Sequence, residues 1–151
     1  MIEWITSFLS NRKQRVRVNS SYSDFKSVTS GIPQGSVLGP ILFVIYINDL
    51  PENLNSDCFM FADDTKVFRQ IQTTSDNENL QADLSNLESW SNTWLLRFHP
   101  DKYKVLTTGK QHDTHHKYTL CNTTLEHVEK EKDIGVTIDN KLNYEQHMMR
   151  K

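Results

Sequence analysis

The sequence has only two cysteines among its 151 residues, Cys58 and Cys121, which are too few for a disulfide framework. This usage is typical of a reducing compartment, and the first residues lack a signal-peptide pattern, so we expect an intracellular protein, nuclear or cytoplasmic. Long hydrophobic runs are also absent. The longest, about residues 37–47, is interrupted by Gly39 and Pro40 and is shorter than the ~20 residues of a membrane span. We therefore expect a soluble protein with no transmembrane segment and no membrane partner.

An excess of charge of one sign is missing as well. Seventeen lysines and arginines stand against nineteen aspartates and glutamates, and the formal net charge is -2. This near balance excludes an overall basic footprint of the kind that binds nucleic acid, so any such contact has to be local. The length is sufficient for one hydrophobic core.

Glycine and proline are scarce, with five and four residues, but three glycines and two prolines fall between Ser30 and Pro40. Glycine permits positive φ angles and close approach of a ligand, while proline fixes the chain between such points, so this stretch predicts a loop of special shape. Pro40 suits the first turn of a helix that runs to about Leu50 before Pro51 ends it, and its apolar faces predict that it is buried. A phosphate-binding P-loop is excluded, because Gly39 is followed by proline and not by lysine.

Two adjacent carboxylates, Asp63 and Asp64, follow a short apolar run. The segment predicts a strand over residues 57–62 and a return strand over residues 66–69, with both carboxylates at the tip of the hairpin. Hard cations such as Mg²⁺ prefer oxygen ligands, and a strand end holds a carboxylate more firmly than a mobile loop does. The alternative is a β-turn with two solvated aspartates, which is the commoner interpretation of an isolated Asp-Asp pair. The surrounding sequence has to decide between them.

The first residues predict a helix and then a basic hairpin. Apolar residues at helical spacing indicate an amphipathic helix over about residues 2–11. Alternation then puts Arg15 and Arg17 on one face of a strand, and the chain turns back between about Ser20 and Asp24. The cationic face suits contact with phosphates, because guanidinium groups pair with them in bidentate geometry. A solvated edge strand protected by its charge explains the pattern equally well.

The remainder of the chain predicts one long helix and several short strands. Ser75 and Glu78 have the spacing of a capping box, so a helix should begin there and run to about Phe98, with Pro100 ending it. Its leucines and tryptophans recur at helical spacing, and we interpret this stripe as core packing. We expect strands at residues 104–107, 117–120, 125–128 and 134–138, with a tight turn at residues 122–123. Hairpins packed on helices make an α+β protein.

Several of these stretches together resemble the reverse transcriptase domain of non-LTR (LINE-type) retrotransposons. The resemblance covers nearly the whole chain, and its blocks have the order and spacing of that family. They read GIPQGSVLGP at residues 31–40, YINDLP at 46–51, FADDT at 61–65, LLRFHPDK at 95–102 and KDIGVTID at 132–139. The resemblance implies an α+β fold that is a partial polymerase palm, with antiparallel hairpins packed on helices. It implies one partial domain over residues 1–151, with fingers and thumb missing.

The resemblance also implies the chemistry of an RNA-directed DNA polymerase, with an RNA template, a DNA primer and dNTPs as partners. Two Mg²⁺ ions serve nucleotidyl transfer in the complete domain. Asp63 matches the principal metal ligand of this turn, and Asp64 its less directly coordinating neighbour. The matched substrate-binding positions are Gln34, Gly35, Phe61 and Ala62. Lys102 matches a basic residue near the leaving pyrophosphate, although from the sequence alone an ordinary solvated lysine at a strand edge is somewhat favoured.

One metal-binding aspartate of the family has no counterpart in this sequence. In the family it lies on a strand ahead of the glycine-rich loop, whereas the only aspartate before Gly31 here is Asp24. Asp64 does not replace it, because adjacent residues on a tight turn do not enclose two ions. We therefore expect the isolated chain to be inactive. The alternative is a non-enzymatic remnant that binds nucleic acid or another partner and exposes apolar surface where the missing strands would pack.

Overall fold

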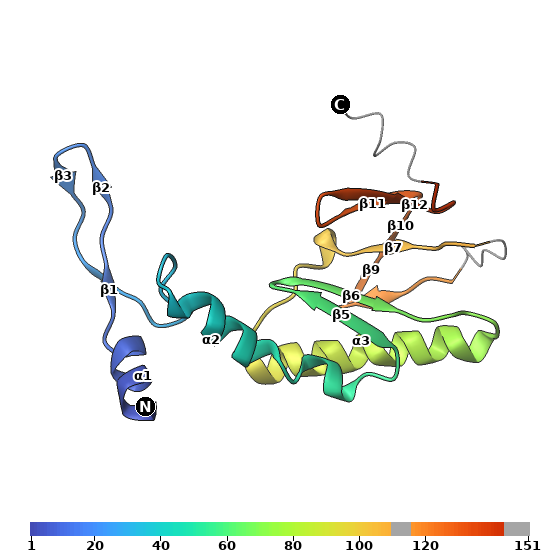
Figure 1. Cartoon of the computed structure of the whole chain (residues 1–151), viewed down its shortest axis with the longest axis horizontal. Helices are drawn as coiled ribbons and strands as arrows, with labels where there is room; N and C mark the ends of the chain where they lie inside the picture. The colour runs from blue at the N-terminus through green and yellow to red at the C-terminus, as the bar shows by residue number, and fades with distance from the viewer. Residues whose placement is uncertain (110–115, 144–151) are drawn as a thin grey trace. The chain divides into compact units, whose positions relative to one another are not determined.

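A computed structural model of the chain describes residues 1–109 and 116–143. The chain divides into two compact units, Met1–Asp49 and Leu50–Lys151, and each is described by itself (Figure 1). The assignment of residues 1–151 to one partial domain therefore stays a prediction. Among the described residues, no helix combines the length and the apolar character needed to cross a membrane.

Both units combine helices with short strands. The first unit contains α1 (Ile2–Leu9), β1 (Lys13–Gln14), β2 (Arg17–Val18), β3 (Ser21–Tyr22), β4 (Lys26–Ser27) and α2 (Leu38–Ile47). The second contains the 3-10 turns η1 (Leu50–Asn53) and η2 (Pro100–Lys102), helix α3 (Thr74–Trp94), and the strands β5 (Asp57–Phe61), β6 (Asp64–Phe68), β7 (Lys104–Leu106), β8 (Thr119–Leu120), β9 (Thr123–Thr124), β10 (Glu126–Val128), β11 (Lys130–Asp133) and β12 (Val136–Asp139). The strands pair two by two, mostly antiparallel, while β7 and β10 are parallel. This mixture is compatible with the predicted α+β class.

The first unit contains the predicted N-terminal helix, α1, and the predicted basic hairpin. The hairpin consists of two short antiparallel pairs, β1 with β4 and β2 with β3. Val18 pairs with Ser21, so the chain turns at Asn19 and Ser20, slightly earlier than predicted. Asn19 has a φ of +52°, a left-handed conformation that asparagine tolerates better than most residues.

Helix α2 follows the glycine-rich loop and has Pro40 in its first turn, as predicted. The prediction that this helix is buried is wrong, because much of its apolar surface is accessible. Ile41 and Val44 are each 53% exposed, and Ile45 is 66% exposed. An apolar sequence indicates which surface is suited to burial, but only a covering element makes it buried.

The second unit contains the predicted hairpin with the two aspartates, formed by β5 and β6. The strands pair in one continuous register from Asp57 with Phe68 to Phe61 with Asp64. The return strand therefore begins at Asp64, two residues before the predicted start. The hairpin lies beside α3 in this unit (Figure 1).

Helix α3 begins slightly before the predicted capping box of Ser75 and Glu78, so that prediction is wrong. The observed box uses Thr73 and Asp76. The Asp76 carboxylate accepts the N–H of Thr73 at 2.9 Å and that of Gln72 at 3.0 Å. Both candidate pairs have the required spacing, so the local sequence did not select between them.

Helix α3 ends earlier than predicted and contributes buried side chains to the core of the second unit. The helix ends at Trp94 because Leu95 takes a left-handed φ of +57°, so the predicted end near Phe98 is wrong. The apolar stripe is core packing, as predicted, with Leu87 and Trp90 buried. A second part of the core has Tyr118, Leu120 and Leu125 at its centre, with Leu80, Leu84, Phe98, Tyr103, Val105 and Cys121 packed against it.

Two turns among the later strands differ from their predictions. The β8–β9 turn uses Cys121 and Asn122, at φ values of +50° and +59°, one residue earlier than predicted. Between β11 and β12 the turn uses Ile134 and Gly135, at +44° and +85°, so the strand predicted over residues 134–138 starts two residues later. Positive φ at both central residues is the mark of a type I′ turn, whose twist matches that of the flanking strands.

Candidate active site

The tip of the β5–β6 hairpin carries the two aspartates that the sequence singled out. Phe61 and Asp64 form the last cross-strand pair, so Ala62 and Asp63 make a two-residue connection. Ala62 has a φ of +53°, which is unfavourable for a residue with a Cβ atom and bends the chain sharply. Both Asp63 and Asp64 are exposed. The predicted presentation of two carboxylates at a hairpin tip is therefore confirmed.

The side-chain carboxylates at this tip have no hydrogen-bond or ion-pair partner among the described residues 1–109 and 116–143. Their oxygens are hard donors of the type that Mg²⁺ prefers, so the residues fit a divalent ion in kind. They do not complete a site, because the described part of the chain contains no group of three or more potential ligands.

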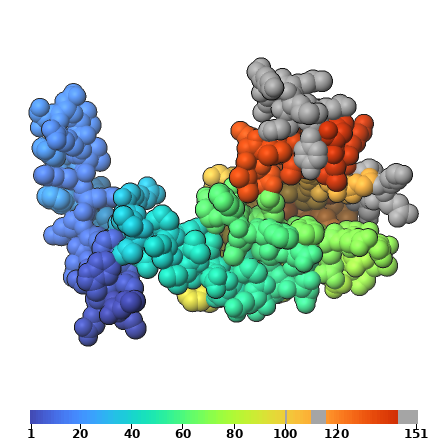
Figure 2. Space-filling view, viewed as in Figure 1, coloured from blue at the N-terminus to red at the C-terminus, as the bar shows by residue number. Residues whose placement is uncertain are grey.

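The two faces of the hairpin differ in exposure. Phe59, Phe61 and Phe68 lie on one face and are 57%, 62% and 50% exposed. The rings of Phe59 and Phe68 stack across the strands, with centroids 5.2 Å apart. Figure 2 shows the hairpin, in green, at the surface of the second unit. Residues on the opposite face, such as Cys58 and Val67, are partly buried. The face with Cys58 and Val67 therefore packs against the rest of the unit, and the face with the phenylalanines is accessible to a partner or substrate.

Lys102 ends the 3-10 turn η2, and its side chain is exposed. Among the described residues it makes no ion pair with Asp63 or Asp64. Its role near a leaving pyrophosphate therefore stays a prediction.

Tyr103 is a residue near the tip that sequence reasoning missed. Burial is the main cause that raises the pKa of its phenol, and the charges of Cys121 and Asp63 raise it further. The Tyr103 hydroxyl therefore lies within electrostatic range of the tip and stays protonated at neutral pH. Its ring packs edge-on against Phe98, at 5.7 Å between centroids. Its place directly after Lys102 was the available signal.

The glycine-rich loop of the first unit has the special backbone that was predicted. Gly31 and Gly35 adopt φ values of +72° and +81°. A Cβ atom on Gly39 would approach the carbonyl oxygen of Pro33 to 3.1 Å, so a side chain there would require the turn to shift by a few tenths of an ångström. Ser36 locks the turn, because its Oγ donates to the Pro33 carbonyl at 2.7 Å and accepts the Gly39 N–H at 3.0 Å.

Gln34 lies in this locked turn, and both it and Gly35 are exposed. They belong to the first unit and Asp63 belongs to the second. Their assignment to substrate binding, like that of Phe61 and Ala62, stays a prediction.

The basic hairpin of the first unit gathers arginines on aromatic rings. The Arg15 guanidinium lies 4.0 Å from the ring centroid of Tyr22 and 4.7 Å from that of Phe25. Arg17 lies 5.4 Å from the same Tyr22 ring. Sequence reasoning found the arginines but missed the rings, which recur on the returning strand. Residues 12–28, which we call the basic arm, contain five basic side chains and one acidic side chain.

Comparison with known proteins decides between the two interpretations of the Asp63–Asp64 pair, a solvated β-turn and the motif of a protein family. The family model described as "Reverse transcriptase (RNA-dependent DNA polymerase)" matches residues 1–138. The chain belongs to this family. The matched region includes the glycine-rich loop, the Asp63–Asp64 tip, Lys102 and the block at residues 132–138. The predicted resemblance is therefore confirmed.

Three curated relatives of this reverse transcriptase chain come from mobile elements of Drosophila melanogaster. The "RNA-directed DNA polymerase from mobile element jockey" is 28% identical, and the match covers 95% of this chain and 17% of that protein. The "Probable RNA-directed DNA polymerase from transposon BS" is also 28% identical, with the same coverage. The corresponding protein from transposon X-element is 26% identical, over 95% of this chain and 16% of its own length. The chain thus spans about a sixth of these relatives. No solved structure gave a significant match.

Membership of the reverse transcriptase family gives the hairpin tip and the glycine-rich loop a chemical context. Members of the family bind nucleic acid templates and nucleotides, and they use divalent metal ions. Two exposed carboxylates that have no partner in the described part of the chain, and a glycine loop of special backbone shape, suit such chemistry.

Proposed function

We propose that this chain is a palm segment of an RNA-directed DNA polymerase of a mobile element, with Asp63 as a carboxylate ligand for Mg²⁺ and Asp64 beside it. The observation that carries the proposal is the hairpin tip, where a family block presents Asp63 from the two-residue turn and Asp64 from the start of β6, both carboxylates without a partner among the described residues. The copied template is RNA, and the other partners are a DNA primer and dNTPs.

Each residue of the candidate site has a role in this proposal. When bound, divalent ions stabilise the attacking 3′ hydroxyl and the departing pyrophosphate. Asp63 holds such an ion. Lys102 neutralises charge on the leaving group. The positions that contact the incoming nucleotide and template are Gln34, Gly35, Phe61 and Ala62.

We further propose that the chain by itself does not polymerise DNA. Two adjacent carboxylates on one tight turn do not enclose two ions, and the described residues supply no third ligand beside them. Another segment of a longer protein has to contribute a carboxylate. A site shared between this chain and another segment agrees with the small part of each relative that the chain spans.

The metal proposal is tested by titrating the chain with Mn²⁺, a paramagnetic substitute for Mg²⁺, and following NMR line broadening. We expect broadening confined to residues around the tip, and we expect Asp63→Asn to abolish it. Asp57→Asn is a matched control, because Asp57 is also exposed and lies on the same hairpin at its other end. Equal broadening in the wild type and in Asp63→Asn would contradict the assignment.

Activity is tested separately by primer extension with Mg²⁺ and dNTPs on an RNA template. We expect no extension by the chain alone. Robust synthesis that Asp63→Ala abolishes would show that the site is complete and that the proposed inactivity is wrong.

A second candidate function, binding of nucleic acid without catalysis, is favoured by the basic arm. Arg15 and Arg17 lie on Tyr22, so the arm combines positive charge with aromatic faces, as single-stranded nucleic acid binders do. We expect RNA affinity that falls with salt, and we expect Arg15→Ala with Arg17→Ala to reduce the log–log salt slope by roughly 1.5. The control pair, Lys132→Ala with Lys141→Ala, removes two exposed charges of the second unit. A salt slope that is unchanged in the arginine variant would rule out the arm as the binding surface.

A further inference from the structure

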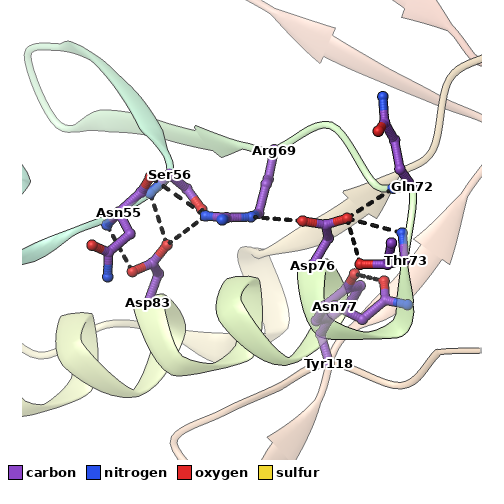
Figure 3. Close-up of polar contacts among 9 residues, drawn as sticks. All are labelled: Asn55, Ser56, Arg69, Gln72, Thr73, Asp76, Asn77, Asp83 and Tyr118. Carbon is purple, nitrogen blue, oxygen red and sulfur yellow. Dashed lines mark hydrogen bonds and ion pairs between the residues drawn. The ribbon is translucent and has the colours of Figure 1, made fainter.

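The hairpin that carries the tip is anchored at its base by a buried carboxylate. Asp83 of α3 is 0% exposed. Its two oxygens accept the backbone N–H groups of Asn55 and Ser56, each at 2.9 Å (Figure 3). These residues lead directly into β5. The carboxylate therefore holds the chain just before the first strand of the hairpin.

Arg69, which directly follows β6, joins the same anchor. Its Nη1 atom lies 4.0 Å from Asp83 Oδ2 and donates to Ser56 Oγ at 3.3 Å and to the Asn55 carbonyl at 3.4 Å. Its Nε atom lies 3.7 Å from Asp76 Oδ1. One guanidinium thus connects the end of β6, the start of β5 and two carboxylates of α3, as Figure 3 shows.

Asp76 is itself held in place at the start of the helix. Its Oδ2 atom accepts the N–H groups of Gln72 and Thr73 as well as the Thr73 hydroxyl. These hydrogen bonds, the one from Gln72 first, lower the pKa of the Asp76 carboxyl. Both carboxylates that face Arg69 are therefore fixed by backbone groups.

We infer that Asp83 is a positioning residue for the proposed metal site: together with Arg69 it fixes both ends of the β5–β6 hairpin on α3 and thereby sets the place of Asp63. The inference rests on the proposed function only for what the tip binds. The anchoring itself is independent of any ligand.

The distance from the anchor to the tip explains why fixing the base matters. Asp63 lies seven positions after Ser56, which is about 23 Å of strand at ~3.3 Å per residue. A tilt of about 5° at the base would move the tip by about 2 Å, whereas a catalytic constellation has to be held within about 0.5 Å. A buried apolar side chain at position 83 would fill the same space, but it would leave the N–H groups of Asn55 and Ser56 without a partner.

The anchor is tested through Cys58, which lies on the partly buried face of β5 and has its pKa raised by burial. In a Cys121→Ser background, a small neutral thiol reagent labels the partly buried Cys58 slowly in the folded protein and faster when the hairpin opens or the protein unfolds. Denaturant titration gives the labelling rate that global unfolding alone allows. We expect Asp83→Asn to raise Cys58 labelling about tenfold above that rate.

Two further variants keep the test decisive. Arg69→Gln alters the partly exposed member of the anchor, so it should fold and still raise labelling several-fold. Glu78→Gln removes an exposed carboxylate from the same helix, and it should leave labelling unchanged. Labelling that follows global unfolding alone in both Asp83→Asn and Arg69→Gln would overturn the inference.

Mn²⁺ broadening of the tip then separates this inference from the proposed function. Weaker Mn²⁺ broadening in the folded Asp83→Asn protein, with Asp63 intact, supports both. No broadening even in the wild type, combined with raised Cys58 labelling in the variants, refutes the metal site and supports the anchor. Wild-type Mn²⁺ affinity in a variant whose Cys58 labelling is raised would overturn the positioning role.

Discussion

Replacing Asp83 by alanine removes the acceptor of two backbone N–H groups, the buried one of Ser56 and the partly buried one of Asn55. Asn55 and Ser56 donate to it at 2.9 Å each. A fully buried donor left unpaired costs about 1–3 kcal/mol and the partly buried Asn55 donor costs less, so the two together predict a loss of about 2–5 kcal/mol of unfolding free energy. The ion pair between Arg69 and Asp83 adds little to this free energy, because Arg69 Nη1 lies 4.0 Å from Asp83 Oδ2 and Arg69 is partly exposed.

This loss is large relative to the ~5–15 kcal/mol that stabilises a typical domain. Urea denaturation followed by tryptophan fluorescence measures it, since Trp90 is buried on the same helix. With a slope of about 2 kcal/mol per molar urea, the midpoint of Asp83→Ala should fall by about 1–2.5 M. Asp83→Asn keeps one acceptor oxygen, so it should lose about half as much.

Glu78→Gln is the matched control, and its unfolding free energy should stay within about 0.5 kcal/mol of wild type. If both Asp83 variants also stay within that range, the reasoning from buried hydrogen bonds would be refuted. A normal slope with a lowered midpoint would support it, whereas a changed slope would indicate an altered native or denatured state.

Three other outcomes are expected. The folded pKa of Asp76 is depressed, so its stabilising contribution is present above the unfolded pKa of about 3.9 and is lost as the pH falls; acid titration of unfolding should therefore be shallower in Asp76→Asn. Ala62→Gly should stabilise the protein by about 0.5–1 kcal/mol in thermal or urea unfolding, because glycine accepts the φ of +53°, whereas Gly135→Ala, at +85°, should destabilise it. Asp63→Asn should lower the pKa of Tyr103 part of the way towards its ordinary value, as ultraviolet titration would measure, because burial and Cys121 still raise it; an unchanged value would place Asp63 out of range.

Local patterns in the sequence predicted the secondary structure well where one signal stood without a competitor. The short apolar run before Asp63 predicted β5, and the closeness of glycines and prolines predicted the loop of special shape with its positive φ values. The predicted start of α3 was wrong because two local capping signals were equivalent. Thr73 and Ser75 both suit a helix start, and the Arg69 contact to Asp76 is compatible with the earlier box.

The anchor of the hairpin lay beyond reach of sequence reasoning. Asp83 sits within a helix, where aspartate usually faces solvent, and its partners Asn55 and Ser56 are nearly thirty positions earlier in the chain. The electrostatic interaction of Tyr103 with Asp63 was likewise not predicted, because residues forty positions apart are brought within range only by the fold of the second unit, and the place of Tyr103 after Lys102 was the one local signal.

By itself, the sequence determined the family, the pair of carboxylates at a turn and the special loop, because each depends on residue types at short, regular spacing. The tertiary structure decided what surrounds them. It showed that α2 keeps apolar surface exposed, that the tip carboxylates are unpaired among the described residues, and that a buried aspartate holds the hairpin base. Burial and pairing depend on contacts between residues distant in the chain, and no local pattern encodes those contacts.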